Sequence, residues 1–284
     1  MAGTWFITGS SRGLGRALTE RLLERGDRVA ATLRTPAVHD DLVERYGDQI
    51  WVRRLDVCDV PDMRAAVDEA FAHFGRVDVV VSNAGYAECG AAEEVSDEQI
   101  ERGLATNLVG AIQLARAVLP HLRAQGGGHI MQMSSTAGQK PYPSMGIYST
   151  TKWGLEGFFE TLAVEVAPFG IRTTIVEPGS VRNEFLANAS WAPAMPEYAD
   201  GPAGFVRTLM TTVPQAALCS DPAKVADAMI AAAEADEAPR RLLLGTDAYG
   251  EIQPALAGRL AEIEAQRETC PRTDADDWTA HPET

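Results

Sequence analysis

The chain has 284 residues, of which 45% are hydrophobic and 23% are charged, an ordinary composition for a globular protein. Forty Asp and Glu residues against 25 Lys and Arg give a formal net charge of −15. This argues against nucleic acid or an anionic membrane as a partner, because both are bound by basic surfaces. The sequence contains no apolar run of the roughly 18 residues that would cross a bilayer, and its apolar start is too short for a signal peptide.

Short apolar runs alternate with longer amphipathic stretches, beginning with an apolar run at residues 5–7 that leads into glycines. Leu14, Leu18 and Leu22 then recur every four residues, which predicts a helix. Further strands are predicted at residues 29–33, 50–55, 77–81, 129–133, 173–176 and 242–244. Helices are predicted between them at residues 65–74, 100–122, 150–167 and 221–235. This alternation indicates βαβ units, so we expect an α/β fold: a single Rossmann-type, doubly wound domain in which a seven-stranded parallel sheet has helices on both faces.

Residues 1–267 are predicted to form this one domain. Residues 183–220 interrupt the alternation, because they contain Trp191 and Tyr198 among other apolar residues and show no clear strand. An insertion of this length and apolarity is typical of a functional lid, with an oligomer contact as the alternative. Residues 268–284 are acidic, contain two prolines and show no periodicity, so we expect a flexible tail.

A glycine-rich turn lies between the first strand and the first helix, with the sequence Thr8-Gly9-Ser10-Ser11-Arg12-Gly13-Leu14-Gly15. Where side chains are absent, a pyrophosphate can approach the backbone, and a helix N-terminus offers it free N–H groups and a positive dipole. The position after the first strand of a βαβ series therefore predicts a dinucleotide site, whereas the alternative is that the glycines only shape the turn. The expected contacts are Gly9, Ser11, Arg12, Gly13, Leu14 and Gly15.

The pattern T-G-x-x-x-G-x-G resembles the cofactor turn of classical short-chain dehydrogenases/reductases, and four further motifs of that family follow in order. They are Asn83-Ala84-Gly85 after the fourth strand, Asn107 in the long helix, Ser135 with Tyr148 and Lys152 (Y-x-x-x-K) 13 residues later, and Pro178-Gly179 after the sixth strand. The resemblance spans roughly residues 4–250. Around Glu177-Pro178-Gly179 the chain is similar to the subgroup that includes 17β-hydroxysteroid dehydrogenases, which does not identify a steroid as the substrate.

The resemblance also bears on the choice of cofactor. An acidic residue at the end of the second strand would favour NAD, but this chain has Leu33 there, followed by Arg34. Arg34 and Arg12 match the family's NADP pattern and would pair with a 2′-phosphate, so we expect NADP(H); two solvated arginines are the alternative. Asp56 and Val57 resemble the residues beside the adenine, or form an ordinary strand end. The remaining expected cofactor contacts are Asn83, Ala84, Gly85, Tyr148, Lys152, Pro178, Gly179 and Val181. Asn183 stands about where the family has a threonine that binds the carboxamide.

Tyr148 and Lys152 are four residues apart and share a helix face. The ammonium would lower the pKa of the tyrosine from about 10 toward working pH, so that Tyr148 could act as acid and base. The family resemblance implies that Lys152 also binds the ribose hydroxyls. It further implies that Ser135 binds the substrate oxygen, with Ser134 as a rival, and that Asn107 holds a water that relays protons. The alternative is that Tyr148 and Lys152 are surface residues.

These residues predict an oxidoreductase that transfers a hydride between NADP(H) and a carbonyl or secondary alcohol, a ketoreductase. The apolar lid favours a hydrophobic or aromatic substrate. The alternatives are an NADP(H)-binding sensor or regulator without turnover, and an isomerase or dehydratase on the same fold. Because the family often assembles through helices like those at 100–122 and 150–167, we expect a homodimer or homotetramer.

Cysteine and histidine residues are scattered along the chain. Cys58, Cys89, Cys219 and Cys270 form no C-x-x-C pair and no Cys/His cluster, so we expect neither disulfides nor a metal site, and a reducing cytoplasm fits best. His73, His121 and His129 are expected to be surface or helix-end residues. Ser96, followed by Asp97-Glu98, is predicted to cap a helix.

Overall fold

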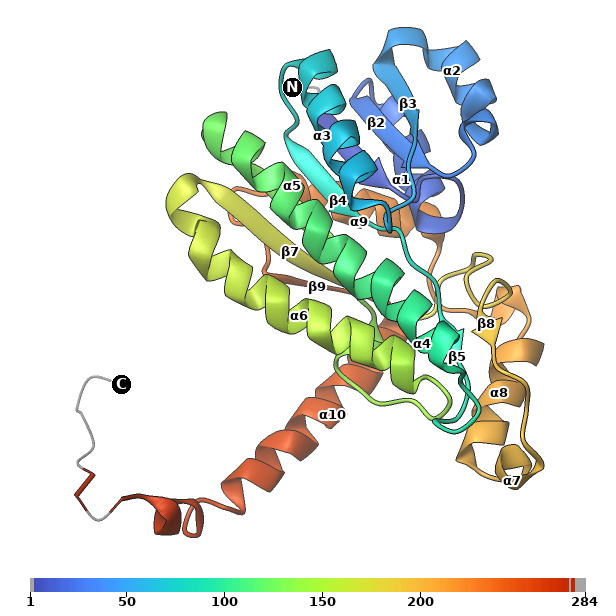
Figure 1. Cartoon of the computed structure of the whole chain (residues 1–284), viewed down its shortest axis with the longest axis vertical. Helices are drawn as coiled ribbons and strands as arrows, with labels where there is room; N and C mark the ends of the chain where they lie inside the picture. Colours follow the sequence, from blue (N-terminus) through green and yellow to red (C-terminus); the bar gives the residue numbers. More distant parts are fainter. Residues whose placement is uncertain (1–2, 276, 279–284) are drawn as a thin grey trace.

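The apolar runs form a seven-stranded parallel sheet in the computed structural model, which describes residues 3–275 and 277–278 (Figure 1). The strand order is β3-β2-β1-β4-β6-β7-β9. The strands are β1 Thr4–Thr8, β2 Arg28–Leu33, β3 Ile50–Arg54, β4 Val79–Ser82, β6 Gly128–Met133, β7 Ile171–Pro178 and β9 Arg241–Leu244. The order reverses between β1 and β4, and in open parallel sheets such a switch point leaves a crevice at the carboxyl ends of the strands. The predicted fold class is confirmed.

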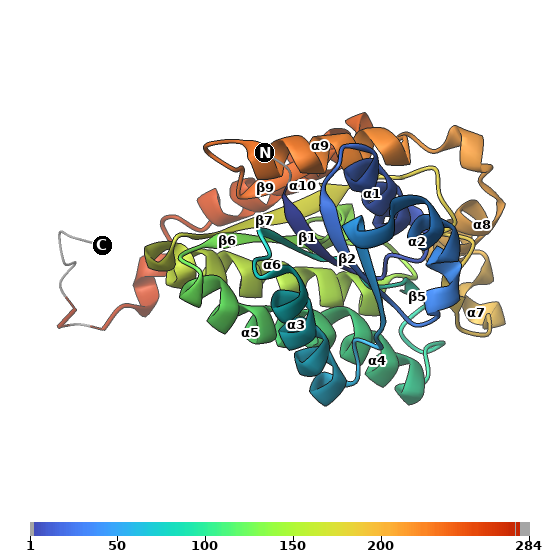
Figure 2. The ribbon, with the colours of Figure 1, turned by 90° about the horizontal axis from the view of Figure 1, so that it is seen from above.

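Helices cover both faces of the sheet, with α1 and α9 on one side and α3, α5 and α6 on the other (Figure 2). The strands are apolar throughout because both of their faces are buried: Ile7 packs with the α1 and α9 side, and its neighbour Phe6 with the other. The bounds of these and the other sheet-flanking helices are α1 Gly13–Glu24, α2 Asp40–Tyr46, α3 Val60–Phe74, α4 Asp97–Leu104, α5 Gly110–Ala124, α6 Gly146–Val166, α9 Pro222–Glu234 and α10 Thr246–Glu264.

Three predicted helices have different limits in the structure, and one of them, α6, begins at Gly146, four residues earlier than predicted. Helix α3 begins five residues earlier than predicted, because the Asp59 side chain accepts a hydrogen bond from the Asp62 N–H (3.1 Å) and Pro61 occupies the first turn. The long helix predicted at residues 100–122 is α4 followed by α5, joined by a π-helical turn at Ala105–Val109. The predicted cap is confirmed, because Ser96 Oγ accepts a hydrogen bond from the Gln99 N–H.

The segment 183–220, called the lid below, contains more regular structure than predicted. Besides the helices α7 (Pro196–Ala199) and α8 (Pro202–Thr212), it contains the two-residue strand β8 (Ser190–Trp191). Strand β8 pairs in parallel with β5 (Glu88–Cys89). The prediction that the lid has no strand is therefore wrong; so short a strand shows no periodicity and depends on its partner.

His129 is buried in β6, with its Nε2 2.9 Å from the Thr174 Oγ1, so the prediction of a surface or helix-end position is wrong for this residue. Burial lowers its pKa to about 4. Within the predicted tail, Cys270–Thr273 form a 3₁₀ turn, while residues 276 and 279–284 lie outside the described residues. In the described part of the chain, no helix is both long and apolar enough to span a bilayer.

Candidate active site

A cavity of about 930 Å³ opens at the carboxyl ends of the strands, where the strand order reverses. Its wall is formed by the segments that follow β1, β2, β3, β4, β6 and β7. Of the predicted site residues, all but Gly15 and Asn107 line it: Gly9, Ser11, Arg12, Gly13, Leu14, Arg34, Asp56, Val57, Asn83, Ala84, Gly85, Ser135, Tyr148, Lys152, Pro178, Gly179 and Val181. The structure thus brings residues from the whole length of the sheet to one concave site.

The glycine-rich turn forms an open cradle at this cavity. Gly9 has φ +67°, and a Cβ there would lie 2.8 Å from the Cα of Ala84. Helix α1 begins at Gly13 (φ +57°) with no side chain capping it and no acidic residue in its first turn. Free N–H groups and the positive end of the helix dipole are therefore available to an anion. These residues fit a pyrophosphate group.

Gly15 has a packing role that sequence reasoning did not separate from ligand contact. A Cβ at Gly15 would lie 2.4 Å from the Gly9 carbonyl oxygen and 2.5 Å from the Asn83 Nδ2. The Asn83 side chain in turn donates hydrogen bonds to the carbonyls of Thr8 (2.9 Å) and Gly9 (3.0 Å). Gly15 therefore lets helix α1 and the segment after β4 approach the turn closely.

The two arginines expected at a 2′-phosphate lie on the same cavity wall, from different segments. Arg34 is exposed at the end of β2. The Arg12 guanidinium donates a hydrogen bond from Nη1 to Oδ1 of Asn188 in the lid (3.0 Å). Arg12 therefore also connects the glycine-rich turn to the lid, a contact that no sequence pattern indicates.

Ser135, Tyr148 and Lys152 lie together deeper in the cavity. Tyr148 is only 5% exposed and packs against Phe185 of the lid, with ring centroids 5.8 Å apart. The Lys152 Nζ donates a hydrogen bond to the Met133 carbonyl (2.8 Å) and lies 5.5 Å from the centre of the Tyr148 ring. The prediction of a shared helix face is confirmed, and the alternative that the pair lies on the surface is excluded by burial.

Burial shifts the pKa values of Tyr148 and Lys152 in opposite directions. It raises the pKa of Tyr148 above its ordinary value, against a lowering contribution from the Ser135 hydroxyl. Burial lowers the pKa of Lys152 to about 8, although the negative charge of Glu156 acts in the opposite direction. In the protein alone, the pKa of Tyr148 is therefore not lowered toward working pH, because loss of water around the phenolate dominates.

Ser134, the rival of Ser135, has a separate contact. Its hydroxyl donates to the Glu156 Oε1 (2.6 Å), so it is engaged with a buried carboxylate. The Ser135 Oγ accepts a hydrogen bond from the Ala137 N–H (3.2 Å) at the start of the following turn. These contacts favour Ser135 as the serine facing Tyr148.

Asn107 lies in the π-helical turn and does not line the cavity. Its Nδ2 donates to the Tyr86 carbonyl (2.8 Å), and its Oδ1 accepts from the Tyr86 N–H (3.1 Å). A Cβ at Gly85 would lie 3.1 Å from the same Oδ1. In the structure, Asn107 thus fixes the backbone that follows the predicted Asn83-Ala84-Gly85 motif.

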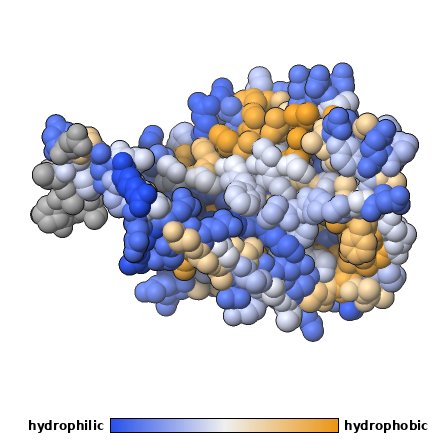
Figure 3. All heavy atoms as spheres, turned by 90° about the horizontal axis from the view of Figure 1, so that it is seen from below, coloured by the Kyte–Doolittle hydropathy of each residue, from blue (hydrophilic) through white to orange (hydrophobic). Residues whose placement is uncertain are grey.

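The segment 183–220 contributes apolar side chains to the cavity wall, namely Phe185, Leu186, Val206, Leu209 and Met210. On α8, Phe205 is 69% exposed and Leu209 51% exposed. Hydrophobic surface gathers in patches on the face seen from below, among hydrophilic side chains (Figure 3). An apolar molecule in the cavity would cover part of this wall and gain the free energy of that burial.

Sequence reasoning missed several residues that line the cavity, among them Tyr86, Arg102, Tyr142 and Glu251. The Tyr142 hydroxyl donates to the Thr136 Oγ1 (2.8 Å) and contacts the Glu251 carboxylate. No motif marks these residues. Asp247 and Glu251 do stand four apart at the start of the helix after the last strand, a spacing that places two carboxylates on one helix face.

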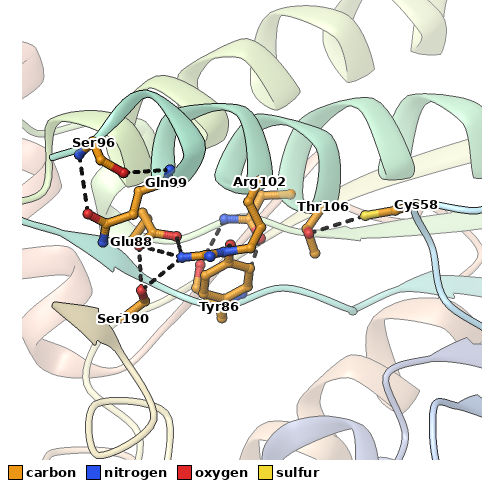
Figure 4. Close-up of polar contacts among 9 residues, drawn as sticks. Cys58, Tyr86, Glu88, Ser96, Gln99, Arg102, Thr106 and Ser190 are labelled. Carbon is orange, nitrogen blue, oxygen red and sulfur yellow. Dashed lines mark hydrogen bonds and ion pairs between the residues drawn. The ribbon is translucent and has the colours of Figure 1, made fainter. Parts of the chain in front are cut away.

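A buried carboxylate attaches the lid to the body of the protein. Glu88 of β5 is 1% exposed and accepts hydrogen bonds from the Ser190 hydroxyl of β8 and from the Gln99 Nε2 (2.7 Å). The Arg102 Nη2 lies 3.3 Å from the Glu88 Oε2, and its Nε donates to the Tyr86 hydroxyl (3.1 Å) (Figure 4). Ser190 is the lid's contribution to this network.

Replacing Ser190 by Ala should loosen the lid. The variant loses two hydrogen bonds to charged groups: the one that the Ser190 hydroxyl donates to Glu88, and a longer one that it accepts from the Arg102 Nη2 (3.3 Å). Glu88 keeps its own contacts with Arg102 and Gln99, so we expect local opening to become easier by about 1–2 kcal/mol. Limited proteolysis within residues 183–220 should accelerate about fivefold or more. Thr212→Ala is the control, because the Thr212 hydroxyl bonds only within α8, to the Thr208 carbonyl (2.7 Å). Equal cleavage rates in both variants would contradict the assignment.

In the part of the chain that the structure describes, no group of three or more His, Cys, Asp or Glu side chains could hold a metal ion. The four cysteines are free thiols, and Cys89 is the buried one.

The chain is similar to known proteins over most of its length. A family model described as short chain dehydrogenase matches residues 4–192. The chain is 38% identical over 265 residues to oxidoreductase BOA17 of Botryotinia fuckeliana, covering 93% of this chain and 94% of that protein.

Solved structures agree with the fold. A short-chain dehydrogenase from Streptomyces avermitilis superposes with a TM-score of 0.89 at 36% identity, covering 97% of this chain and 99% of that one. An alcohol dehydrogenase from Thermococcus sibiricus, complexed with 5-hydroxy-NADP, gives a TM-score of 0.70 at 25% identity, covering 87% and 97%.

Proposed function

Because the chain belongs to the short-chain dehydrogenase family, an oxidoreductase family with a nicotinamide dinucleotide cofactor, we propose that it is an NADP(H)-dependent ketoreductase. It would interconvert a carbonyl compound and a secondary alcohol. The observation that carries the proposal is the convergence of Ser135, Tyr148 and Lys152 with the glycine-rich turn in one cavity. The same fold in the alcohol dehydrogenase complexed with 5-hydroxy-NADP supports the choice of cofactor class.

When bound, the nicotinamide dinucleotide supplies the hydride. The backbone of the glycine-rich turn and the N-terminus of α1 would hold its pyrophosphate, since no side chain caps that helix. Arg12 and Arg34 would bind a 2′-phosphate, and this selects NADP(H) over NAD(H). Asp56 and Val57 would flank the adenine, and Lys152 would bind the nicotinamide ribose. The remaining contacts would come from Asn83, Ala84, Gly85, Pro178, Gly179 and Val181, with Asn183 near the carboxamide.

Tyr148 is the proposed proton donor. Its raised pKa keeps the phenol protonated at neutral pH, which is the state that reduction of a carbonyl requires of an acid. Ser135 would hydrogen-bond the substrate oxygen as negative charge develops there. Lys152 is cationic below its pKa of about 8 and would stabilise the phenolate left by proton donation. Asn107 would support a proton relay by fixing the backbone at Tyr86.

The lid indicates the chemical class of the substrate. Phe185, Leu209 and Met210 are apolar parts of the cavity wall, and Phe185 packs against the Tyr148 ring, so we propose a hydrophobic or aromatic ketone.

The assay that tests the proposal follows the absorbance of NADPH in the presence of a homologous series of methyl ketones. Each methylene that becomes buried against the lid contributes about 0.8 kcal/mol, so we expect kcat/KM to rise roughly fourfold per added CH₂ until the cavity is full. Binding of NADPH with no oxidation by any ketone, aldehyde or secondary alcohol would instead support a sensor. Conversion of a substrate without net change in NADPH would support an isomerase or dehydratase.

The proposal also includes the oligomeric state of the protein and its location in the cell. We place a homodimer or homotetramer interface on the helices at 100–122 and 150–167, where Val109, Trp153 and Val164 are exposed at 45%, 42% and 66%. We also place the protein in the cytoplasm, because its cysteines are free thiols, as is usual in a reducing compartment.

A further inference from the structure

A cluster of buried charges lies next to the residues proposed for catalysis, and its side chains do not line the cavity. Glu156 of α6 is 4% exposed and Glu177 of β7 is 1% exposed. Both carboxylates contact the Arg241 guanidinium of β9, which also binds the half-exposed Glu160. Three carboxylates therefore meet one arginine at the edge of the sheet, and the proposed reaction assigns none of them a role.

Glu156 holds the turn that carries Ser135. Its Oε1 accepts the Ser134 hydroxyl (2.6 Å), and its Oε2 accepts hydrogen bonds from the Gln139 side chain and from the Arg241 Nη1 (2.7 Å). A Cβ at Gly138 would lie 1.9 Å from the Glu156 Oε1, so the backbone of this turn rests against the carboxylate. One side chain of α6 thus fixes residues 134–139 at both of their ends.

Glu156 also lies one helical turn beyond Lys152, so the two share a face of α6. Its charge raises the pKa of Lys152 against the effect of burial. The other charged groups around Glu156 are Glu160 on α6, Glu177 on β7 and Arg241 on β9. Burial, followed by the charge of Glu156, raises the pKa of Glu177 to about 7. One Glu177 oxygen, Oε2, is buried without a hydrogen-bond partner among the described residues.

We propose that Glu156 is a positioning residue of the active site: it holds the turn that presents Ser135, and its carboxylate acts on the Lys152 ammonium one helical turn away. This inference rests on the proposed function for the roles of Ser135 and Lys152. The contacts themselves link the helix that carries Tyr148 and Lys152 to the turn that carries Ser135, through one buried side chain.

The first test titrates Lys152 in the protein without cofactor. The extent of reductive methylation of Lys152 by formaldehyde and sodium cyanoborohydride, which reduces the imine, is measured by mass spectrometry across neutral to alkaline pH. We expect a midpoint near 8 in the wild type, as for the pKa of Lys152, and a clearly lower midpoint in Glu156→Gln. Glu160→Gln is the matched control, because Glu160 binds the same arginine one turn further along α6. A midpoint that is unchanged in Glu156→Gln, or shifted equally in Glu160→Gln, overturns the electrostatic part of the proposal.

The second test uses turnover. Loss of cationic Lys152 should lower kcat of Glu156→Gln roughly three- to tenfold at pH 8 and less at pH 6, since a shift of one pKa unit changes the charged fraction up to tenfold. Ser134→Ala removes the contact of Glu156 with the first end of the turn, leaves the contact with Gln139, and keeps the charge. It should lower kcat about fivefold at every pH and leave the Lys152 midpoint unchanged. A Ser134→Ala enzyme with wild-type kcat overturns the part of the proposal that concerns the turn.

Glu156→Asp provides a second test in case Glu156→Gln does not fold, because aspartate keeps the negative charge on a side chain that is one methylene shorter. We expect a Lys152 midpoint close to that of the wild type together with reduced kcat, and a midpoint lowered as in Glu156→Gln would overturn the proposal. The proposed function and the proposed role of Glu156 can be refuted independently of each other. If Lys152 titrates as expected but no carbonyl compound oxidises NADPH, the proposed function fails and the coupling of Glu156 to Lys152 stands.

Discussion

Tyr148→Phe is expected to lower kcat for ketone reduction by roughly 10²–10⁴-fold, the contribution typical of a positioned general acid. The substitution removes only the hydroxyl from a side chain that is 5% exposed and packed against Phe185. The ring therefore keeps its contacts, and the protein should fold with little change in stability. Binding of NADPH, measured by its fluorescence, should stay within about threefold of the wild type, because the proposed dinucleotide contacts lie mainly on other residues.

Tyr142→Phe is the matched control. Tyr142 also lines the cavity, and its hydroxyl also makes hydrogen bonds, to Thr136 and Glu251. Loss of that hydroxyl removes contacts within the wall and not the proton donor, so kcat should fall by less than about tenfold. Similar losses in the two variants, or full activity of Tyr148→Phe, would refute the role given to Tyr148.

The arrangement of the sheet could be predicted because parallel strands covered on both faces are continuous apolar runs, which are visible in one sequence. The same property explains why the glycine-rich turn and the motifs after later strands come together, since the segments after successive parallel strands meet at one edge. Strands β5 and β8 could not be predicted. Each has two residues, and their pairing depends on Glu88 and Ser190, which are far apart in the chain and show no periodic pattern.

Within the site, motifs located the reactive groups but not their surroundings. Tyr148 and Lys152 could be placed on one helix face from their spacing alone. The direction in which the pKa of Tyr148 shifts could not be predicted, because it depends on how completely the fold removes water from the phenol. The contact of Asn107 with the Tyr86 backbone is likewise a tertiary feature, made possible by a π-helical turn that no residue pattern marked.

Arg34→Ala is expected to weaken the binding of NADPH strongly and the binding of NADH hardly at all. A charge-assisted hydrogen bond to a phosphate contributes about 1.5–3 kcal/mol, so the KM for NADPH should rise ten- to hundredfold. NADH has no 2′-phosphate, so its KM should rise by less than about threefold. The preference between the two cofactors is therefore the quantity to measure. Arg34 is a sharper test than Arg12, because Arg12 also bonds Asn188 of the lid and its removal would disturb two functions.

The control for this substitution is Arg45→Ala, which removes an exposed arginine of α2 that stacks on the neighbouring Tyr46 ring at 5.0 Å and does not line the cavity. It should change neither cofactor's KM by more than about twofold, since exposed charges at a distance are screened by salt. Raising the ionic strength should reduce the preference of the wild type for NADPH and leave the smaller preference of Arg34→Ala nearly unchanged. If Arg34→Ala weakens the binding of NADPH and NADH equally, Arg34 supports the strand end and does not recognise a phosphate. That result would refute the proposed selectivity for NADP(H).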